Sequence, residues 1–143
     1  MLKGIPPIMS PELMEVLMRM GHGDDLVIAD GNFPAETMGR RVVRTDGHGV
    51  PEILDAVLTF VPVDTFVSDP VKVMQPVDPD VPEPPIWTQF RDQLARHEAR
   101  PIPLTLVERF EFYRLAQSAF AVIATGETAI YANIILKKGV VTS

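Results

Sequence analysis

The segment MGHGDDLVIAD, residues 20–30, holds one histidine and three aspartates within eleven positions. His22 lies between two glycines, and Asp30 follows four consecutive apolar residues. Because an imidazole titrates near neutral pH, it can accept and donate a proton in a reversible reaction. A histidine between glycines also suits an ordinary turn, and an aspartate after a strand commonly caps one. The segment therefore predicts either an ordinary turn or an acid–base site, and this segment alone does not separate the two interpretations.

Several other chemistries lack the residues that they need. The chain has no cysteine, which excludes thiolate chemistry and disulfides, and no Gly-x-Ser-x-Gly motif of a hydrolytic nucleophile. Its histidines, at positions 22, 48 and 97, are not spaced as metal ligands. GHGDD lies between a predicted helix and a predicted strand, whereas a dinucleotide-binding loop lies between a strand and a helix. We therefore expect no metal and no cofactor, which leaves acid–base and hydrogen-bonding groups.

Composition narrows the class of protein. The 143 residues suit one domain spanning residues 1–143, because a chain of this length buries about two thirds of its unfolded surface. Lys and Arg number 13 against 19 Asp and Glu, and no segment combines basic with aromatic residues, which argues against nucleic acid and membrane surfaces as partners. No apolar run approaches the ~20 residues that span a bilayer, and the first residues lack the pattern of a signal peptide. We expect a cytoplasmic protein.

Capping and turn residues delimit the expected helices. In SPELMEVLMRMG, Ser10 can cap the helix, Pro11 suits its first position and Gly21 can end it. This helix is therefore expected to end just before His22. Apolar residues at helical spacing predict three further helices, at residues 50–60, 84–98 and 106–119.

Short apolar runs predict the strands. DLVIA, residues 25–29, suits a strand that is buried on both faces. Further strands are expected at residues 41–44, 63–67, 71–75, 120–126 and 130–139. Helices that alternate with such strands predict an α/β fold, namely a layered α/β/α single domain whose sheet is largely buried and mostly parallel or mixed.

Two segments between these elements are expected to be loops. Residues 31–39 contain Gly31, Pro34 and Gly39, which interrupt regular structure. QPVDPDVPEPP holds five prolines in eleven residues, and proline suits neither a helix interior nor a central strand. We therefore expect a proline-rich surface loop at about residues 76–85 within the single domain.

Polar residues in the second half of the chain have two interpretations each. Tyr131 and Asn133 are two positions apart, so in a strand they face the same side, where a ligand can supply the partners that a buried asparagine needs. Arg109, in a predicted helix, is either a surface charge paired with Glu108 or Glu111, or a group that binds a ligand. The residues alone leave both interpretations open.

Three ordered blocks of the chain resemble one family. SPELMEVLMRMGHGDDLVIAD, RFEFYRLAQSAFAVIATGE and YANIILKKGV are similar to the corresponding parts of the family that contains L-fucose mutarotase and D-ribose pyranase. The resemblance extends over most of the chain and is weakest through the proline-rich stretch. RFEFY followed by GETAIYAN is closer to the fucose branch than to the ribose branch.

The resemblance implies a function and a set of site residues. The implied activity is cofactor-independent interconversion of the α and β anomers of a free monosaccharide, L-fucose, in a ring-shaped homo-oligomer that is expected to be a decamer. His22 is implied as the catalytic proton donor. The residues implied to contact the sugar are Asp30, Arg109, Tyr131 and Asn133.

Some alternatives remain open at this point. Fucose enzymes of the family carry a histidine where this chain has Asn32, and this departure bears on the identity of the sugar more than on the reaction. A D-ribose pyranase is the nearest alternative enzyme. A sugar-binding module without catalysis would need the same polar groups but no titrating His22.

The expected strand raises a geometric problem. If residues 25–29 are extended, His22 and Asp30 lie at opposite ends of that strand and as much as roughly 25 Å apart. One monosaccharide is too small to bridge that distance. Either the loops at the two ends of the strand curl over the sheet towards each other, or residues of a neighbouring subunit complete the sugar site. We favour the second arrangement as a hypothesis, because a closed homo-oligomer brings one end of a protomer against the other end of the next.

Overall fold

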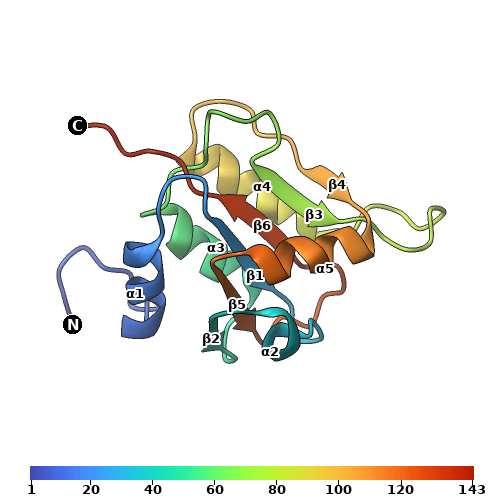
Figure 1. Cartoon of the computed structure of the whole chain (residues 1–143), viewed down its shortest axis with the longest axis horizontal. Coiled ribbons are helices and arrows are strands. Elements are labelled where there is room, and N and C mark those ends of the chain that lie inside the picture. Colours follow the sequence, from blue (N-terminus) through green and yellow to red (C-terminus); the bar gives the residue numbers. More distant parts are fainter.

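A six-stranded sheet lies at the centre of the computed structural model, which describes all 143 residues (Figure 1). The elements follow one another as α1 (Pro11–Arg19), β1 (Asp25–Ala29), α2 (Ala35–Met38), β2 (Val42–Thr45), α3 (Val50–Leu58), β3 (Val71–Met74), α4 (Ile86–His97), β4 (Thr105–Val107), α5 (Arg109–Ser118), β5 (Ala121–Thr125) and β6 (Ile134–Lys137). The strand order is β2-β5-β1-β6-β3-β4. Only β6 runs antiparallel to its neighbours, so the sheet is mixed, and the predicted α/β fold is confirmed.

Helices cover both faces of this sheet. In Figure 1, α5 lies in front of the strands and α3 and α4 lie behind them. Along β1, Leu26 and Ile28 belong to a core cluster of 27 residues with α1, α3 and α4, whereas Val27 and Ala29 belong to a cluster of 12 residues with α2 and α5. Successive side chains of a strand point to opposite faces, so β1 is buried on both sides and anchors both layers.

The first helix and strand form where local signals predict them. The Ser10 hydroxyl oxygen accepts a hydrogen bond from the Leu13 N–H at 3.1 Å, and Pro11 begins α1. The helix ends at Arg19 with Met20 as its C-terminal cap, just ahead of the predicted glycine. β1 has the predicted bounds. The turn that carries His22 therefore lies between two firmly bounded elements.

Residues 63–67 do not form the predicted strand. Only Val63 pairs, through an isolated bridge to Lys138. Phe66 is 74% exposed while Asp64 is buried, so the alternation in VDTFV does not describe one face of a sheet. The Asp64 N–H still donates to the Lys137 carbonyl oxygen at 3.0 Å, its side chain is bonded to His22, and the residues that follow have no strand partner.

Three other boundaries differ from the prediction. Residues 31–39 are not entirely loop, because they contain the short helix α2. The helix predicted at 106–119 begins only at Arg109, because the residues before it pair with β3 as the edge strand β4. The strand predicted at 130–139 begins only at Ile134. Each difference depends on pairing with a distant strand or on a local backbone turn, and residue periodicity reports neither.

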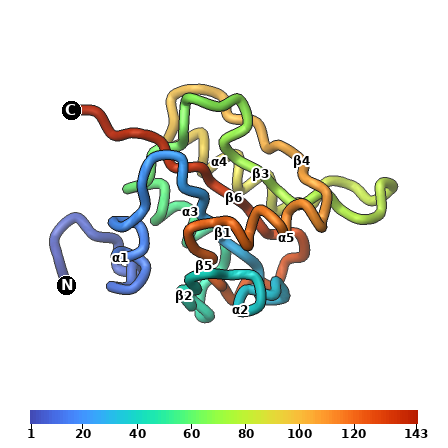
Figure 2. Tube along the Cα trace, in the orientation of Figure 1, coloured from blue at the N-terminus to red at the C-terminus, as the bar shows by residue number.

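The segments outside the layers project at opposite sides of the molecule. The loop between β3 and α4, which contains the prolines of residues 76–85, extends to the right in Figure 2. The N-terminal segment arches away from α1, and the C-terminal residues extend on the side opposite to that loop. None of the helices has the length and apolar character needed to cross a membrane.

Candidate active site

His22 lies in the turn between α1 and β1 and is bonded to a buried carboxylate. Its Nε2 atom is 3.0 Å from Oδ1 of Asp64, which lies between α3 and β3. The His22 side chain is 45% exposed, whereas the Asp64 side chain is only 2% exposed. An accessible imidazole is therefore held from one side by an acid that solvent does not reach.

The surroundings of Asp64 keep it ionised. Burial raises the pKa of its carboxyl, but the hydrogen bond to His22, the N–H groups of Phe66 and Thr65 and the positive charge of His22 together lower that pKa below its usual value. Arg100 fixes the backbone at this point, because its Nη2 donates to the Asp64 carbonyl oxygen at 2.7 Å. An ionised Asp64 accepts a hydrogen bond from Nε2 of the imidazole, so in the neutral ring Nδ1 carries a free lone pair.

The two glycines that flank His22 are fixed by hydrogen bonds from their backbone N–H groups. Gly23 has a φ of +85°, a left-handed conformation that glycine adopts without strain. Its N–H donates to the Lys138 carbonyl oxygen at 2.8 Å, and the Gly21 N–H donates to the Asp24 carboxylate at 2.8 Å. The turn therefore presents His22 in a defined position.

Asp30 and Asn133 form a second buried pair. The Asp30 N–H donates to Asn133 Oδ1 at 2.9 Å, and Asn133 Nδ2 donates to Asp30 Oδ2 at 3.1 Å. The other oxygen of Asp30 accepts from the Asn32 N–H at 3.0 Å. Burial raises the pKa of the Asp30 carboxyl, and it outweighs the opposing hydrogen bonds from Asn32, Phe33, Ala132 and Asn133. Asp30 thus caps the turn after β1 and also orients an amide.

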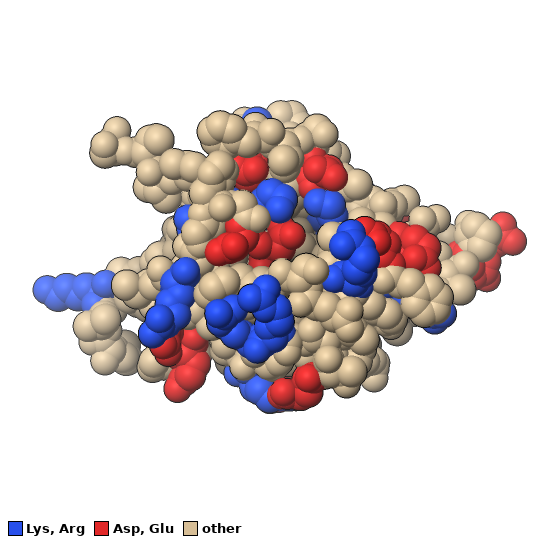
Figure 3. Space-filling view, in the orientation of Figure 1, with Lys and Arg blue, Asp and Glu red and all other residues tan.

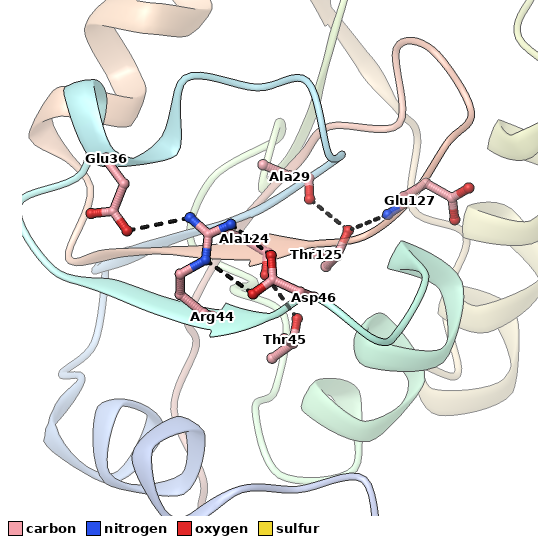
Figure 4. A network of polar contacts seen from close by, with 8 residues as sticks. All are labelled: Ala29, Glu36, Arg44, Thr45, Asp46, Ala124, Thr125 and Glu127. Atoms are coloured by element: carbon pink, nitrogen blue, oxygen red, sulfur yellow. Dashed lines mark hydrogen bonds and ion pairs between the residues drawn. The ribbon is translucent and has the colours of Figure 1, made fainter.

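A network of hydroxyl groups sets where β1 ends (Figure 4). Thr125 Oγ1 donates to the Ala29 carbonyl oxygen at 2.7 Å and accepts from the Glu127 N–H at 3.1 Å. The Glu127 carbonyl oxygen in turn accepts from the Gly31 N–H at 2.8 Å. Thr45 donates to the Ala124 carbonyl oxygen, which joins β2 to the same strand ends. These bonds place Asp30 at the carboxyl ends of the parallel strands.

Tyr131 does not lie on a strand, which corrects the expectation that it shares a strand face with Asn133. Its φ is +56°, and it is the only residue other than glycine with a positive φ. Its hydroxyl oxygen accepts from the Val77 N–H at 3.1 Å, and its carbonyl oxygen accepts from Trp87 Nε1 at 2.9 Å. Tyr131 is therefore placed by tertiary contacts.

Arg109 is the first residue of α5 and does not form the ion pairs that a surface helix charge would. Glu108 accepts from the N–H groups of Phe110 and Glu111 as the helix cap, and Glu111 pairs with Arg114 instead. The guanidinium carbon of Arg109 lies 4.6 Å from the centre of the Phe110 ring. Its hydrogen-bond donors remain available to a ligand.

The structure brings the predicted site residues together in part. Asp30 and Asn133 are bonded directly, and Tyr131 lies two residues before Asn133. His22 lies at the other end of β1, where sequence reasoning missed its partner Asp64. The one available signal for Asp64 is that it is an acidic residue within the mainly apolar segment VPVDTFV, whose alternation predicts a strand at 63–67.

Charged side chains of both signs are mixed over one face of the molecule, as Figure 3 shows. No three His, Asp or Glu side chains lie together in a way that could hold a metal ion. The polar groups of the site residues are one imidazole, one guanidinium, two buried carboxylates, an amide and a phenol, which are kinds of group that bind the hydroxyl groups of an uncharged polar molecule.

Comparison with known proteins gives consistent matches over the length of the chain. The model of the RbsD / FucU transport protein family matches residues 3–141. A human protein named fucose mutarotase is 48% identical over 145 residues, which cover 97% of this chain and 94% of the human protein.

Solved structures of similar proteins also match over nearly the whole length of this chain. A fucose mutarotase from Streptococcus pneumoniae, in complex with L-fucose, superimposes with a TM-score of 0.93 at 42% identity, covering 99% of this chain and 100% of that one. FucU from Bifidobacterium longum also gives a TM-score of 0.93, at 52% identity and with 98% and 100% coverage. Bacillus subtilis RbsD complexed with D-ribose is more distant, with a TM-score of 0.73 at 23% identity over 99% and 100% of the two chains, and it shares the fold.

Proposed function

The chain belongs to the RbsD / FucU transport protein family, and we propose that it is an isomerase that interconverts the α and β anomers of L-fucose. One observation carries this proposal: its similarity extends over nearly the whole chain to proteins named fucose mutarotase, one of them solved with L-fucose. The relative solved with D-ribose is only 23% identical. L-fucose is therefore the proposed substrate, and D-ribose is the competing sugar in the test.

The proposed reaction needs two proton transfers, one from the anomeric hydroxyl group and one to the ring oxygen of the sugar. A base removes the proton of the anomeric hydroxyl, an acid protonates the ring oxygen, and the bond between that oxygen and the anomeric carbon breaks. Rotation of the open-chain aldehyde followed by ring closure gives the other anomer. His22 fits this exchange because Asp64 holds its Nε2 proton and stabilises the imidazolium that forms when Nδ1 accepts a proton. A positioned acid–base group of this kind contributes about 10²–10⁴-fold.

The remaining predicted residues are proposed to bind the sugar hydroxyl groups. Asp30 and Asn133 form a preorganised polar pair. Arg109 offers donors that no carboxylate occupies. The Tyr131 hydroxyl oxygen already accepts from Val77, so its hydrogen is left to be donated to a sugar oxygen.

We place this site between subunits of a ring-shaped homo-oligomer, with the decamer that the resemblance implies. β1 is five residues long and separates the His22 pair from the Asp30 pair by about 13 Å along the strand alone. Each end also carries an exposed aromatic ring, Phe66 against His22 and Phe110 against Arg109. Exposed apolar groups beside two half-sites support a contact in which one protomer presents His22 to the Asp30 end of the next.

The activity is tested by magnetization-transfer NMR, which measures α/β exchange of each free sugar at equilibrium. Enzyme-dependent exchange of L-fucose that is faster than that of D-ribose supports the proposal, and the reverse order assigns the protein to the ribose branch. Sugar binding without any added exchange would leave a binding module only.

The shared site is tested by complementation. Mixed assemblies of two inactive variants, His22→Gln and Asp30→Asn, regain activity if the two residues meet across an interface. Light scattering on the same samples gives the subunit number, and a fully active monomer would refute the shared site.

A cytoplasmic location is the last part of the proposal. The chain has no cysteine, so none of its stability depends on disulfides formed in an oxidising compartment. Fractionation of cells that express the full-length protein tests this location.

A further inference from the structure

We propose that Trp87 and the proline-rich loop are positioning elements for Tyr131, which together hold its hydroxyl group where the sugar binds. This inference rests on the proposed function for the role of Tyr131. Tyr131 has the backbone conformation that side chains rarely adopt, with a φ of +56°. Such a conformation persists only where surrounding contacts enforce it.

The first of these contacts comes from α4. Trp87 Nε1 donates to the Tyr131 carbonyl oxygen at 2.9 Å. Trp87 is only 2% exposed and belongs to the 27-residue core cluster, so its ring has little freedom to move. The Tyr131 backbone is therefore fixed by a donor that is itself fixed by packing.

The second contact comes from the proline-rich loop and acts on the other end of Tyr131. The Val77 N–H donates to the Tyr131 hydroxyl oxygen at 3.1 Å. This bond sets where the phenol ends and leaves the hydroxyl hydrogen free for a sugar oxygen. The tyrosine is thus held at its carbonyl group and at its hydroxyl group by two different elements.

The same helix also restrains the loop. Arg91 lies one helical turn after Trp87 on α4, and its Nη1 donates to Glu83 Oε2 at 2.8 Å, with a second bond from Nη2 to Oε1. An open pocket of about 320 Å³ lies between the loop, α4 and the residues around β4, and is lined by Pro76, Arg91 and Leu104 among others. The Arg91–Glu83 pair links α4 to the loop that carries Val77. Helix α4 thus contacts Tyr131 directly through Trp87, and through Arg91 it also restrains the loop whose Val77 bonds the Tyr131 hydroxyl group.

The central test replaces the donor and keeps an aromatic ring. Trp87→Phe removes the N–H group, and we expect KM for L-fucose to rise about five- to tenfold, the factor that one lost hydrogen bond carries, while kcat changes less than about twofold. Phe90→Leu is the matched control, because Phe90 is buried on the same helix but has no bond to Tyr131. It is expected to lower the melting temperature and leave KM unchanged.

A second variant avoids the core. Glu83→Gln weakens the hold of Arg91 on the loop, and we expect a smaller rise in KM, about two- to threefold. Glu15→Gln is its control, since it weakens an exposed ion pair with Arg19 on α1. A Tyr131→Phe background then shows whether both effects pass through the tyrosine, because Trp87→Phe and Glu83→Gln should add no further rise in KM there.

Amide hydrogen exchange gives a readout that does not depend on sugar turnover. The Val77 amide should lose protection in Tyr131→Phe and in Trp87→Phe, by about tenfold, and should keep it in Phe90→Leu. Unchanged Val77 protection in folded Trp87→Phe overturns the inference, as does a KM effect that persists undiminished in the Tyr131→Phe background. Wild type and His22→Gln in the same assay report on the proposed function separately, so its failure is distinguishable from failure of the positioning role.

Discussion

Replacing Asp64 by asparagine tests whether this buried carboxylate makes His22 an acid–base group. The change keeps the shape of the side chain and removes its charge. Asp64 accepts from His22 Nε2 at 3.0 Å and is almost fully buried, so no solvent replaces the lost charge. A hydrogen bond to a charged group is worth about 1.5–3 kcal/mol against about 1 kcal/mol for a neutral one. The difference, about 0.5–2 kcal/mol, predicts L-fucose exchange that is about 2- to 30-fold slower.

The same variant has a pH signature in stability. The pKa of Asp64 is lowered in the folded protein from its ordinary value of 3.8, so the ionised side chain stabilises the fold above that value. This contribution is lost as the pH falls through the lowered pKa. Urea unfolding should therefore show Asp64→Asn less stable than wild type at pH 7, with a difference that narrows near pH 3.

The chain contains a matched control for this experiment. Asp55 accepts from His97 Nε2 at 2.6 Å between α3 and α4, and its pKa is likewise lowered, chiefly by the hydrogen bond to His97. Asp55→Asn should reduce stability and leave the exchange rate unchanged. Wild-type exchange by a folded Asp64→Asn protein would refute the role given to this carboxylate.

Three further outcomes are expected. His22→Gln should slow L-fucose exchange by about 10²–10⁴-fold with unchanged circular dichroism, and near-normal rates would exclude His22 as the acid–base group. Gly23→Ala should cost about 1 kcal/mol in urea unfolding and slow exchange, because φ is +85° there, whereas Gly21→Ala should be tolerated at its negative φ. Arg109→Gln should raise KM for L-fucose about tenfold, since a neutral amide replaces the guanidinium, and an unchanged KM would remove Arg109 from the site.

The fold class and the first elements were predictable because their signals are local. Ser10 and Pro11 mark the start of α1, and an uninterrupted apolar run gives β1 its bounds. Alternating helices and strands then restrict the architecture to a few layered solutions. The family blocks add His22, Asp30, Arg109, Tyr131 and Asn133 as expected site residues, which residue chemistry alone leaves as turns, caps and surface charges.

Errors in the prediction arose where tertiary contacts override a local pattern. VDTFV alternates like a strand, yet only Val63 finds a partner. The residues before Arg109 continue a helical pattern, yet they pair with β3 at the edge of the sheet. Tyr131 leaves the predicted strand because its positive φ is enforced by Trp87 and Val77, which come from elsewhere in the sequence.

The sequence by itself determined the kinds of group present, the layered fold and the absence of cysteine chemistry. Only the tertiary structure decided which groups meet. His22 reaches Asp64 across 42 positions, and Asp30 reaches Asn133 across 103. Periodicity and capping operate over a few residues, whereas these pairs form because the sheet order brings β6 beside β1 and the segment after α3 back to the turn before β1. The partners that give each polar group its chemistry were therefore set by topology.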